Sequence, residues 1–462
     1  MTNMKVVVGV LCALASAGSC HGAAPVRPGQ WEALRGALKA WTDISFDANY
    51  AVTVGDATGN LFTYVSPGFS MTTRVEGASL SKWPSAVMIS GLVADGILSY
   101  DDYAHKYLPY WATEEQDPRS RVTLRSLLSF TSGLLEDGYT ACFERYEICA
   151  RKLYEDLPRK AWTEPRTEFQ YLSGHLQFAG AMAVAASNKT IEELFDHYLY
   201  KKFNMTNTTY GPIPWNPSMA GGITSTGQDF ESMLHSLLTY QGLPKEVCEQ
   251  METDWTKAPV DPSGDGWFGH YGFGHWWECL GYGDAGERTP LPPLCTDAHI
   301  QAGPGEFGFY PLLDRSGGGG AAGPTRQPYY MAVVLAEPDS LSGIPEYLRI
   351  VVKPIVDIIL SGGDATTTPR EQILKAGGGL LLRDVTYIEG ELERCQCSGG
   401  QQGDPYASLN QGEREDRKGV SRYTLMEEGE GHTLFEVAEL QKKIGVCNCE
   451  GRRRSDPKQH HV

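Results

Sequence analysis

A serine and a lysine three positions apart, Ser79 and Lys82, are the residues of this sequence best suited to covalent chemistry. Side chains three apart on a helix lie on one face, so the lysine amine can reach the serine hydroxyl. A serine is an effective nucleophile only when a base lies within hydrogen-bond distance of its oxygen, and the amine provides that contact. The same spacing recurs at Ser455 and Lys458 in a polar tail, so spacing alone does not choose between the two pairs.

The segment that begins at the first pair has the pattern of a helix, which would hold the two side chains together. Residues 79–97 are largely apolar, and Pro84 falls in the opening turns, where a missing amide proton costs little. The helix is therefore predicted to begin no earlier than about Leu80. Ser79 would then lie at its amide-rich end, and Lys82 within its first turn.

Other elements are predicted from apolar periodicity and turn residues. Helices are expected at residues 31–44 and 347–360, and strands at residues 50–54, 61–65, 271–277, 306–313 and 329–336. Between the two groups of strands, residues 100–260 are mostly helix and loop. The helix at 347–360 carries Lys353 and Asp357 and is interpreted as amphipathic, packed on a sheet.

Charge and the N-terminal residues limit the partners and the compartment. The formal net charge of −17 disfavours nucleic acid or an anionic membrane as the main partner. Residues 1–22 have a lysine, an apolar run and then small residues, which is the pattern of a secretory signal peptide. That run is too short to span a membrane. We therefore expect a secreted, extracellular protein without a stable membrane span.

The cysteines agree with an oxidising compartment. Nine of the eleven lie beyond residue 22, and eight of them fall into close pairs: Cys142 with Cys149, Cys279 with Cys295, Cys395 with Cys397, and Cys447 with Cys449. Disulfides are favoured over a zinc site for the tail cysteines, because zinc sites more often use Cys-x-x-Cys spacing. Cys248 is the odd cysteine. Three glycosylation sequons begin at Asn188, Asn204 and Asn207.

Composition divides the chain into three parts. After the signal peptide, residues 31–361 have globular composition, whereas residues 362–462 are rich in glycine and charge. This C-terminal extension is either a small disulfide-tied module or a flexible tail, and its protein partners are unknown. Ser316 and the glycines after it lack the context of a phosphate loop, and His270, His275 and Cys279 lack supporting carboxylates. We therefore expect no cofactor and no metal.

The segments around Ser79 resemble the serine β-lactamase-like superfamily, in the branch of class C β-lactamases, D-alanyl-D-alanine carboxypeptidases and related esterases. The resemblance covers about residues 31–361. It rests on six segments in the same order: residues 79–82, 91–109, 127–134, 203–208, 221–226 and 271–274. It implies an α+β fold, in which an antiparallel sheet flanked by helices lies beside an all-helical lobe. The active site would lie in the cleft between them.

The resemblance also assigns roles to residues. Ser79 matches the nucleophile, and Lys82 matches the lysine that takes or shuttles its proton; which group is the acylation base is disputed in this superfamily. Tyr171 matches the tyrosine of a Tyr-x-Asn motif, but Ser173 replaces its asparagine. Tyr171 is therefore expected to transfer protons near the nucleophile, or else to be an ordinary core tyrosine.

The third motif of the family departs further from the pattern. Residues 305–310 align with its glycine-rich strand, which makes Gly305 and Phe307 candidates for substrate binding. The oxyanion hole would use the amide of Ser79 and one from residues 306–308. Residues 300–302, Ile-Gln-Ala, then fall where the family has Lys-Thr-Gly. His299 either replaces the missing cation or is an ordinary surface histidine. Loss of the cation argues against carboxylate-bearing substrates and less against neutral esters.

Three functions remain compatible with these residues. The favoured one is a secreted serine hydrolase that acts through an acyl-enzyme on a small-molecule or peptide-like ester or amide. The second is a catalytically inactive relative that serves as a binding or cell-surface module, since the third motif is altered. The third is a structural protein whose cysteine tail is the functional part. Reaction of Ser79 with a fluorophosphonate separates the first from the others.

Overall fold

The computed structural model describes residues 29–44, 49–137, 142–256, 270–277, 299–316, 326–336, 352–353 and 355–363. The predicted signal peptide, nearly all of the C-terminal extension, and the expected cysteine pairs beyond residue 278 lie outside these residues. Within them, no helix is long and apolar enough to cross a membrane.

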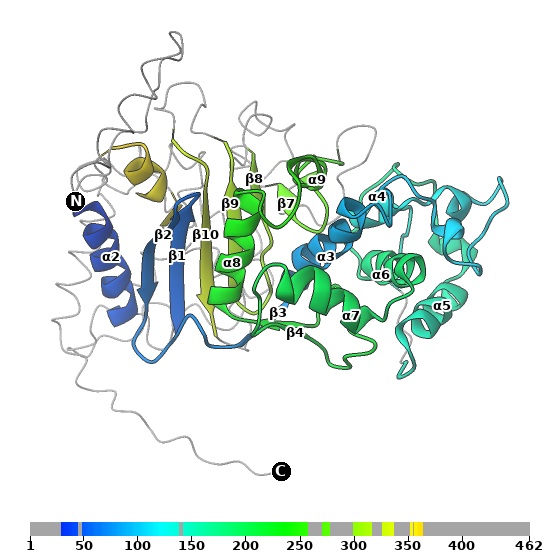
Figure 1. Cartoon of the computed structure of the whole chain (residues 1–462), viewed down its shortest axis with the longest axis horizontal. Coiled ribbons are helices and arrows are strands. Elements are labelled where there is room, and N and C mark those ends of the chain that lie inside the picture. Colours follow the sequence, from blue (N-terminus) through cyan, green and yellow to red (C-terminus); the bar gives the residue numbers. More distant parts are fainter. Residues whose placement is uncertain are drawn as a thin grey trace, which may run out of the picture.

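A seven-stranded antiparallel sheet forms one half of the molecule, in the order β2-β1-β10-β9-β8-β7-β6 (Figure 1). Its strands are β1 (Tyr50–Asp56), β2 (Gly59–Val65), β6 (His270–Tyr271), β7 (Trp276–Trp277), β8 (Ile300–Ala302), β9 (Phe309–Asp314) and β10 (Tyr329–Leu335). Of the strands that the structure describes, the first, β1, pairs with the last, β10, in a register that sets Val52 opposite Val333. The expected antiparallel sheet is confirmed.

Helices cover both faces of this sheet. On one face, α2 (Gln30–Ile44) and the helical residues 352–353 and 355–360 enclose an apolar core with β1, β2 and β10. On the other face lies α8 (Gly227–Leu238), whose buried side chains recur at helical spacing: Phe230, Met233, Leu234 and Leu237. Thr226 caps the N-terminus of this helix, because its side chain accepts a hydrogen bond from the amide of Asp229.

The other half of the molecule is helical (Figure 1). It contains α3 (Lys82–Ala94), α4 (Leu124–Leu128), α5 (Tyr146–Asp156), α6 (Gly174–Ser187), α7 (Ile191–Phe195), the π-helical turn η5 (Asp196–Lys201) and α9 (Lys245–Met251), with short 3-10 turns η1 (Ser79–Ser81), η2 (Ala104–Lys106), η3 (Pro118–Arg121) and η4 (Arg159–Ala161). Its core is rich in aromatic side chains, for example Trp111 edge-on to Phe178. Cys142 and Cys149 form the expected disulfide beside α5, and Cys248 is free and buried.

A small second sheet joins the halves and carries the segment that leads to Ser79. Its order is β3-β5-β4, where β3 is Val75–Ala78, β4 is Thr209–Tyr210 and β5 is Ile223–Ser225. Because β3 leads directly into η1, the pairing of β3 with β5 fixes the position of η1 and of the start of α3.

Two predicted elements differ from the structure in their extent. The helix expected at 79–97 is a 3-10 turn followed by α3, and it ends at Ala94 because Gly96 adopts a positive φ of 69°. The strand expected at 271–277 is instead two short antiparallel strands, β6 and β7. They are separated by a turn with Gly274 at a φ of 74°.

A third prediction was wrong at its start. Residues 306–308 are not strand, because the amide of Gly308 donates to the carbonyl of Gly305 and closes a turn. The strand begins only at Phe309.

Four charged side chains lie buried between the sheet and the helical residues 352–353 and 355–360. Lys353 donates to Asp314 at 2.8 Å and to Asp357 at 2.9 Å, and Arg326 contacts the same two carboxylates. Lys353 and Asp357 are 1% and 6% exposed. The amphipathic interpretation of this helix therefore missed that these two residues face the sheet as an ion pair.

Candidate active site

Ser79 lies at the junction of β3 and η1, where the backbone conformation is unusual. The preceding residue, Ala78, has φ 45° and ψ −123°, a region that side chains rarely occupy and that costs about 1–3 kcal/mol. Ser81 supports the turn, since its hydroxyl donates to the carbonyl of Ala78 at 2.6 Å and accepts from the amide of Ile223 at 2.9 Å. Ser79 itself is half-buried, so its hydroxyl is both fixed and accessible.

Lys82 contacts the Ser79 hydroxyl as the sequence predicts. Its Nζ lies 2.9 Å from Ser79 Oγ and 2.9 Å from the carbonyl oxygen of Ala220. Burial disfavours the charged amine and lowers the pKa of Lys82 to about 7, although Asp137 and Glu306 act in the opposite direction. Near neutral pH a large share of Lys82 is therefore uncharged and able to accept a proton from Ser79.

Tyr171 is the third residue that the structure brings to this point. Burial raises the pKa of Tyr171 to about 12, although hydrogen bonds with Ser79 and Trp276 act in the opposite direction. The Lys82 Nζ lies over the face of the Tyr171 ring, 4.5 Å from its centre. The phenol therefore remains protonated at neutral pH, and it can donate a hydrogen bond or deliver a proton. Lys82 is the better base of the two.

Aromatic packing holds Tyr171 in place. Trp276 stacks on its ring at 5.0 Å, and Phe130 lies 5.6 Å away. Phe130 in turn stacks on His175, whose ring nitrogens are hydrogen-bonded to Ser132 Oγ and to the carbonyl of Gln170, both at 2.9 Å. Burial lowers the pKa of His175 to about 3, so this histidine is a neutral supporting residue rather than a base.

Replacing Tyr171 by phenylalanine tests its role, because the ring packing is kept while the hydroxyl is lost. We expect kcat/KM on a chromogenic ester to fall about 10²-fold, with an unchanged melting temperature. The matched control is Tyr100→Phe, which removes a buried hydroxyl bonded to Ser90 away from the site. The control should lose about 1 kcal/mol of stability and keep its activity. If Tyr171→Phe behaves like Tyr100→Phe, Tyr171 is only a core residue.

Ser173 lies beside the site, but its side chain is exposed. It marks the start of α6, where Asp137 accepts hydrogen bonds from the amides of Ser173 and Gly174, both at 3.0 Å. A carboxylate at a helix N-terminus is a favourable arrangement. Ser173, at the position of the family asparagine, thus contacts Asp137 through its backbone amide. Asp137 is also close enough to Lys82 to raise the pKa of its amine.

Gly305 lies against the nucleophile segment, as its alignment predicts. A side chain at this position would come within 2.2 Å of the carbonyl oxygen of Gly77, so only glycine permits the approach. Phe307 is half-buried in the turn that follows. The Gly308 amide already donates to Gly305, and the Gly305 amide donates to Phe309. Any oxyanion donor in this turn therefore comes from Glu306 or Phe307, together with the amide of Ser79.

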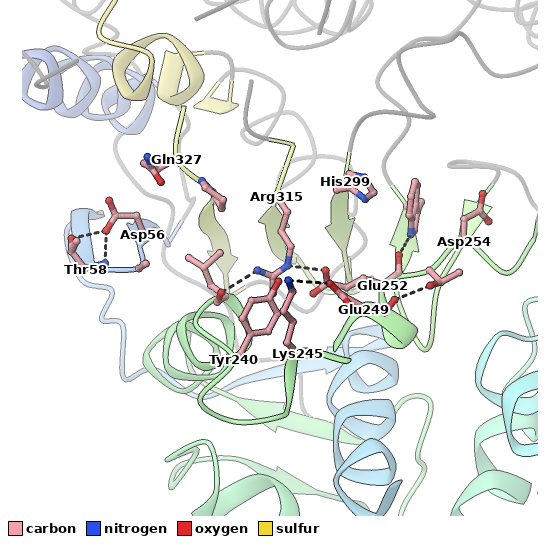
Figure 2. Close-up of a pocket in the computed structure, with 15 residues that line it drawn as sticks. Asp56, Thr58, Tyr240, Lys245, Glu249, Glu252, Asp254, His299, Arg315 and Gln327 are labelled. Atoms are coloured by element: carbon pink, nitrogen blue, oxygen red, sulfur yellow. Dashed lines mark hydrogen bonds and ion pairs between the residues drawn. The ribbon is translucent and has the colours of Figure 1, made fainter. Parts of the chain in front are cut away.

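His299 does not join Ser79. It precedes β8, whereas Gly303, just after β8, packs against Trp83, which is next to Lys82 in the chain. The histidine ring is edge-on to Trp277 and lines a separate cavity of about 830 Å³ (Figure 2). His299 therefore does not replace the missing cation, because β8 lies between this histidine and the residues near Ser79.

That cavity has its own charged lining but no group of metal ligands. In Figure 2, Arg315 points toward Glu252, with which it forms an ion pair at 2.7 Å, and lies over the ring of Tyr240. Among the residues that the structure describes, no three His, Cys, Asp or Glu side chains converge on one point.

Comparison with known proteins agrees with the fold described above. Residues 62–288 match the β-lactamase family. The chain is 23% identical over 235 residues to Protein flp of Staphylococcus aureus (strain MW2); the alignment covers 43% of this chain and 46% of flp. The chain thus spans less than half the length of that relative. The chain has a serine β-lactamase-like domain.

Solved structures show the same fold. A Bacteroides dorei DSM 17855 protein assigned as a β-lactamase has 24% identity and a TM-score of 0.53, over 70% of this chain and 98% of its own. FmtA from Staphylococcus aureus has 12% identity and a TM-score of 0.51, over 78% and 94%. At these identities the likeness concerns the fold of the β-lactamase-like domain alone.

Three features of the site in this β-lactamase-like domain were not predicted from the sequence. The carbonyl of Ala220 is a second partner of Lys82, and no sequence pattern marks a single backbone oxygen. Trp276 stacks on Tyr171, whereas the sequence indicated only that it belongs to the strand expected at 271–277. Asp137 lies three residues after the matched segment 127–134, and this closeness in the chain was the one indication in the sequence that it lies near the site.

Proposed function

We propose that this protein is a serine hydrolase that acts through an acyl-enzyme on an ester or amide substrate. The observation that carries the proposal is the contact of Lys82 Nζ with Ser79 Oγ, made by a buried amine whose pKa is lowered to about 7. A nucleophile and a base in contact, with the base poised near the working pH, are the requirements for this chemistry.

In the proposed acylation step, Ser79 Oγ attacks the substrate carbonyl carbon while Lys82 takes the hydroxyl proton. The carbonyl oxygen becomes an oxyanion near the amide of Ser79, where one such donor is typically worth ~3 kcal/mol. Tyr171, protonated because its pKa is about 12, donates to the leaving oxygen or nitrogen as its bond to carbon breaks. Water then attacks the ester of Ser79, with its proton passing to the same groups, and releases the acid.

We also propose that the protein is exported and that neutral esters are better substrates than carboxylate-bearing β-lactams. Export is supported by the pattern of residues 1–22 and by the disulfide between Cys142 and Cys149. The substrate preference is supported by β8, where Ile300, Gln301 and Ala302 supply no cation for a carboxylate.

A fluorophosphonate probe tests the proposed hydrolase directly, because it phosphonylates only an activated serine. We expect the mature wild-type protein to be labelled, and the Ser79→Ala variant to be unlabelled. The matched control is Ser455→Ala, which removes the serine of the second Ser-x-x-Lys tetrad and should be labelled like wild type. Wild-type protein that is folded by circular dichroism and yet unlabelled would contradict the hydrolase function and favour a binding module.

A further inference from the structure

Two acidic residues belong to segments that adjoin the Ser79–Lys82–Tyr171 site, one in the helical half and one in the turn before β9. Asp137 is held at the start of α6 by the amides of Ser173 and Gly174. Glu306 follows Gly305, whose backbone packs against Gly77 at the nucleophile segment. Both carboxylates are exposed to solvent. Both act on the charge of Lys82, although one comes from the helical lobe and the other from the turn before β9.

The charge of this site depends on the state of Lys82. When Lys82 is protonated, it compensates one of the two carboxylates. When it is neutral, as a base must be to take the Ser79 proton, Asp137 and Glu306 are left without that compensation. The active form of the site is therefore its most negative form. A substrate carboxylate entering it would be repelled, whereas a substrate cation would replace the lost charge.

A substrate cation would also favour the active form of the enzyme. A positive charge near Lys82 disfavours protonation of the amine, and an anion has the opposite effect. The groups in contact with the amine carry no charge at neutral pH: they are the Ser79 hydroxyl, the carbonyl of Ala220 and the ring of Tyr171. The charge of the substrate thus affects both its binding and the fraction of enzyme in which Lys82 is neutral and able to accept the proton.

On the basis of the proposed hydrolase function, we propose that Asp137 and Glu306 select esters or amides that carry a positive charge, such as an ammonium group, close to the scissile carbonyl. The selection is the reverse of carboxylate anchoring, for which β8 provides no cation. It makes Asp137 and Glu306 specificity-determining residues of this site.

The test uses three 4-nitrophenyl esters of equal acyl length, which end in trimethylammonium, in the isosteric tert-butyl group, or in carboxylate. For wild type we expect kcat/KM to be about tenfold higher for the cationic than for the neutral ester, and lower again for the anionic one. The preference should shrink in 0.5 M salt, because the two carboxylates are exposed.

Variants that remove one or both carboxylate charges test whether Asp137 and Glu306 cause the preference for the cationic ester. Glu306→Gln should reduce the cationic preference severalfold, and Asp137→Asn with Glu306→Gln should abolish it. Glu306→Gln should also move the acidic limb of the neutral ester's pH profile to lower pH, because Glu306 raises the pKa of Lys82. The control is Glu136→Gln, which removes an exposed carboxylate adjacent to Asp137 in the sequence and should keep the wild-type ranking. Glu306 is exposed, so its variant does not endanger folding if Asp137→Asn fails to fold.

The outcomes separate the two proposals. Turnover of all three esters at equal rates, or a ranking unchanged in Glu306→Gln, would overturn the charge selection and leave the hydrolase intact. A pH limb that shifts in the variant without a change in ranking would show that the carboxylates serve Lys82 alone, which also overturns it. Failure to hydrolyse any ester, together with absent fluorophosphonate labelling, would overturn both.

Discussion

Replacing Lys82 by methionine is expected to lower kcat/KM for a neutral ester about 10³-fold. Methionine has similar length and is apolar, so it fills the buried space while removing the amine that contacts Ser79 Oγ and the carbonyl of Ala220. The loss is large because the serine would then have no base within hydrogen-bond distance. The measurement is steady-state hydrolysis by purified protein whose fold is verified by circular dichroism.

The pH profile identifies the base. Lys82 must be neutral to accept the proton, so wild-type kcat/KM should rise with pH and level off above an apparent pKa near 7. The residual activity of Lys82→Met should lack this limb. Lys201→Met, which removes an exposed lysine paired with Asp196, is the control and should keep both rate and profile. A wild-type rate that is flat from pH 6 to 9 would exclude Lys82 as the titrating base.

The second large effect is on stability. Replacing Lys353 by methionine is expected to reduce the free energy of unfolding at pH 7 by ~3–5 kcal/mol. Lys353 is 1% exposed and donates to both Asp314 and Asp357. Its removal therefore leaves two buried carboxylates with one cation of this cluster, Arg326, to neutralise them. The measurement is urea unfolding followed by fluorescence, with Lys106→Met as the exposed control, which should unfold at nearly the wild-type urea concentration.

The acid dependence of this effect follows from Asp314. Burial alone would raise the pKa of Asp314, but attraction to Lys353 and Arg326 outweighs it and holds the pKa well below its usual range. The unfolded chain then binds a proton before the folded one does, so wild-type stability falls as pH drops below about 4. Without Lys353 the pKa of Asp314 rises and this fall becomes shallower. Unfolding curves of equal acid dependence in the two proteins would contradict the interpretation.

Sequence reasoning predicted the parts of the site that lie close together in the chain or carry a recognisable motif. Ser79 and Lys82 are one helical turn apart, and Tyr171 belongs to a known triplet, so the structure brings all three together. The residues that were missed act across the fold. Ala220 reaches Lys82 through its backbone, and Glu306 reaches it from the turn before β9.

Other misses have local causes. Residues 271–277 have the aromatic composition of a strand, but Gly272 and Gly274 allow the chain to turn back within them. His299 was placed near the site by alignment, yet β8 separates it from Gly303 and Gly305. Charge was taken as a sign of exposure in the helix that contains Lys353, whereas two cations and two carboxylates together permit burial.

The pairing of β1 with β10 has a consequence for the order of events during biosynthesis. Val52 is made long before its partner Val333, and until β10 follows it, β1 has only β2 beside it. Contacts between such distant segments close slowly, and an unpaired strand edge invites association with other chains. The turn at Gly305, which completes the surroundings of Ser79, is also made late. For much of translation, Ser79 is therefore present without the residues that complete its surroundings. The site can form only after the turn at Gly305 and strands β9 and β10 have been made.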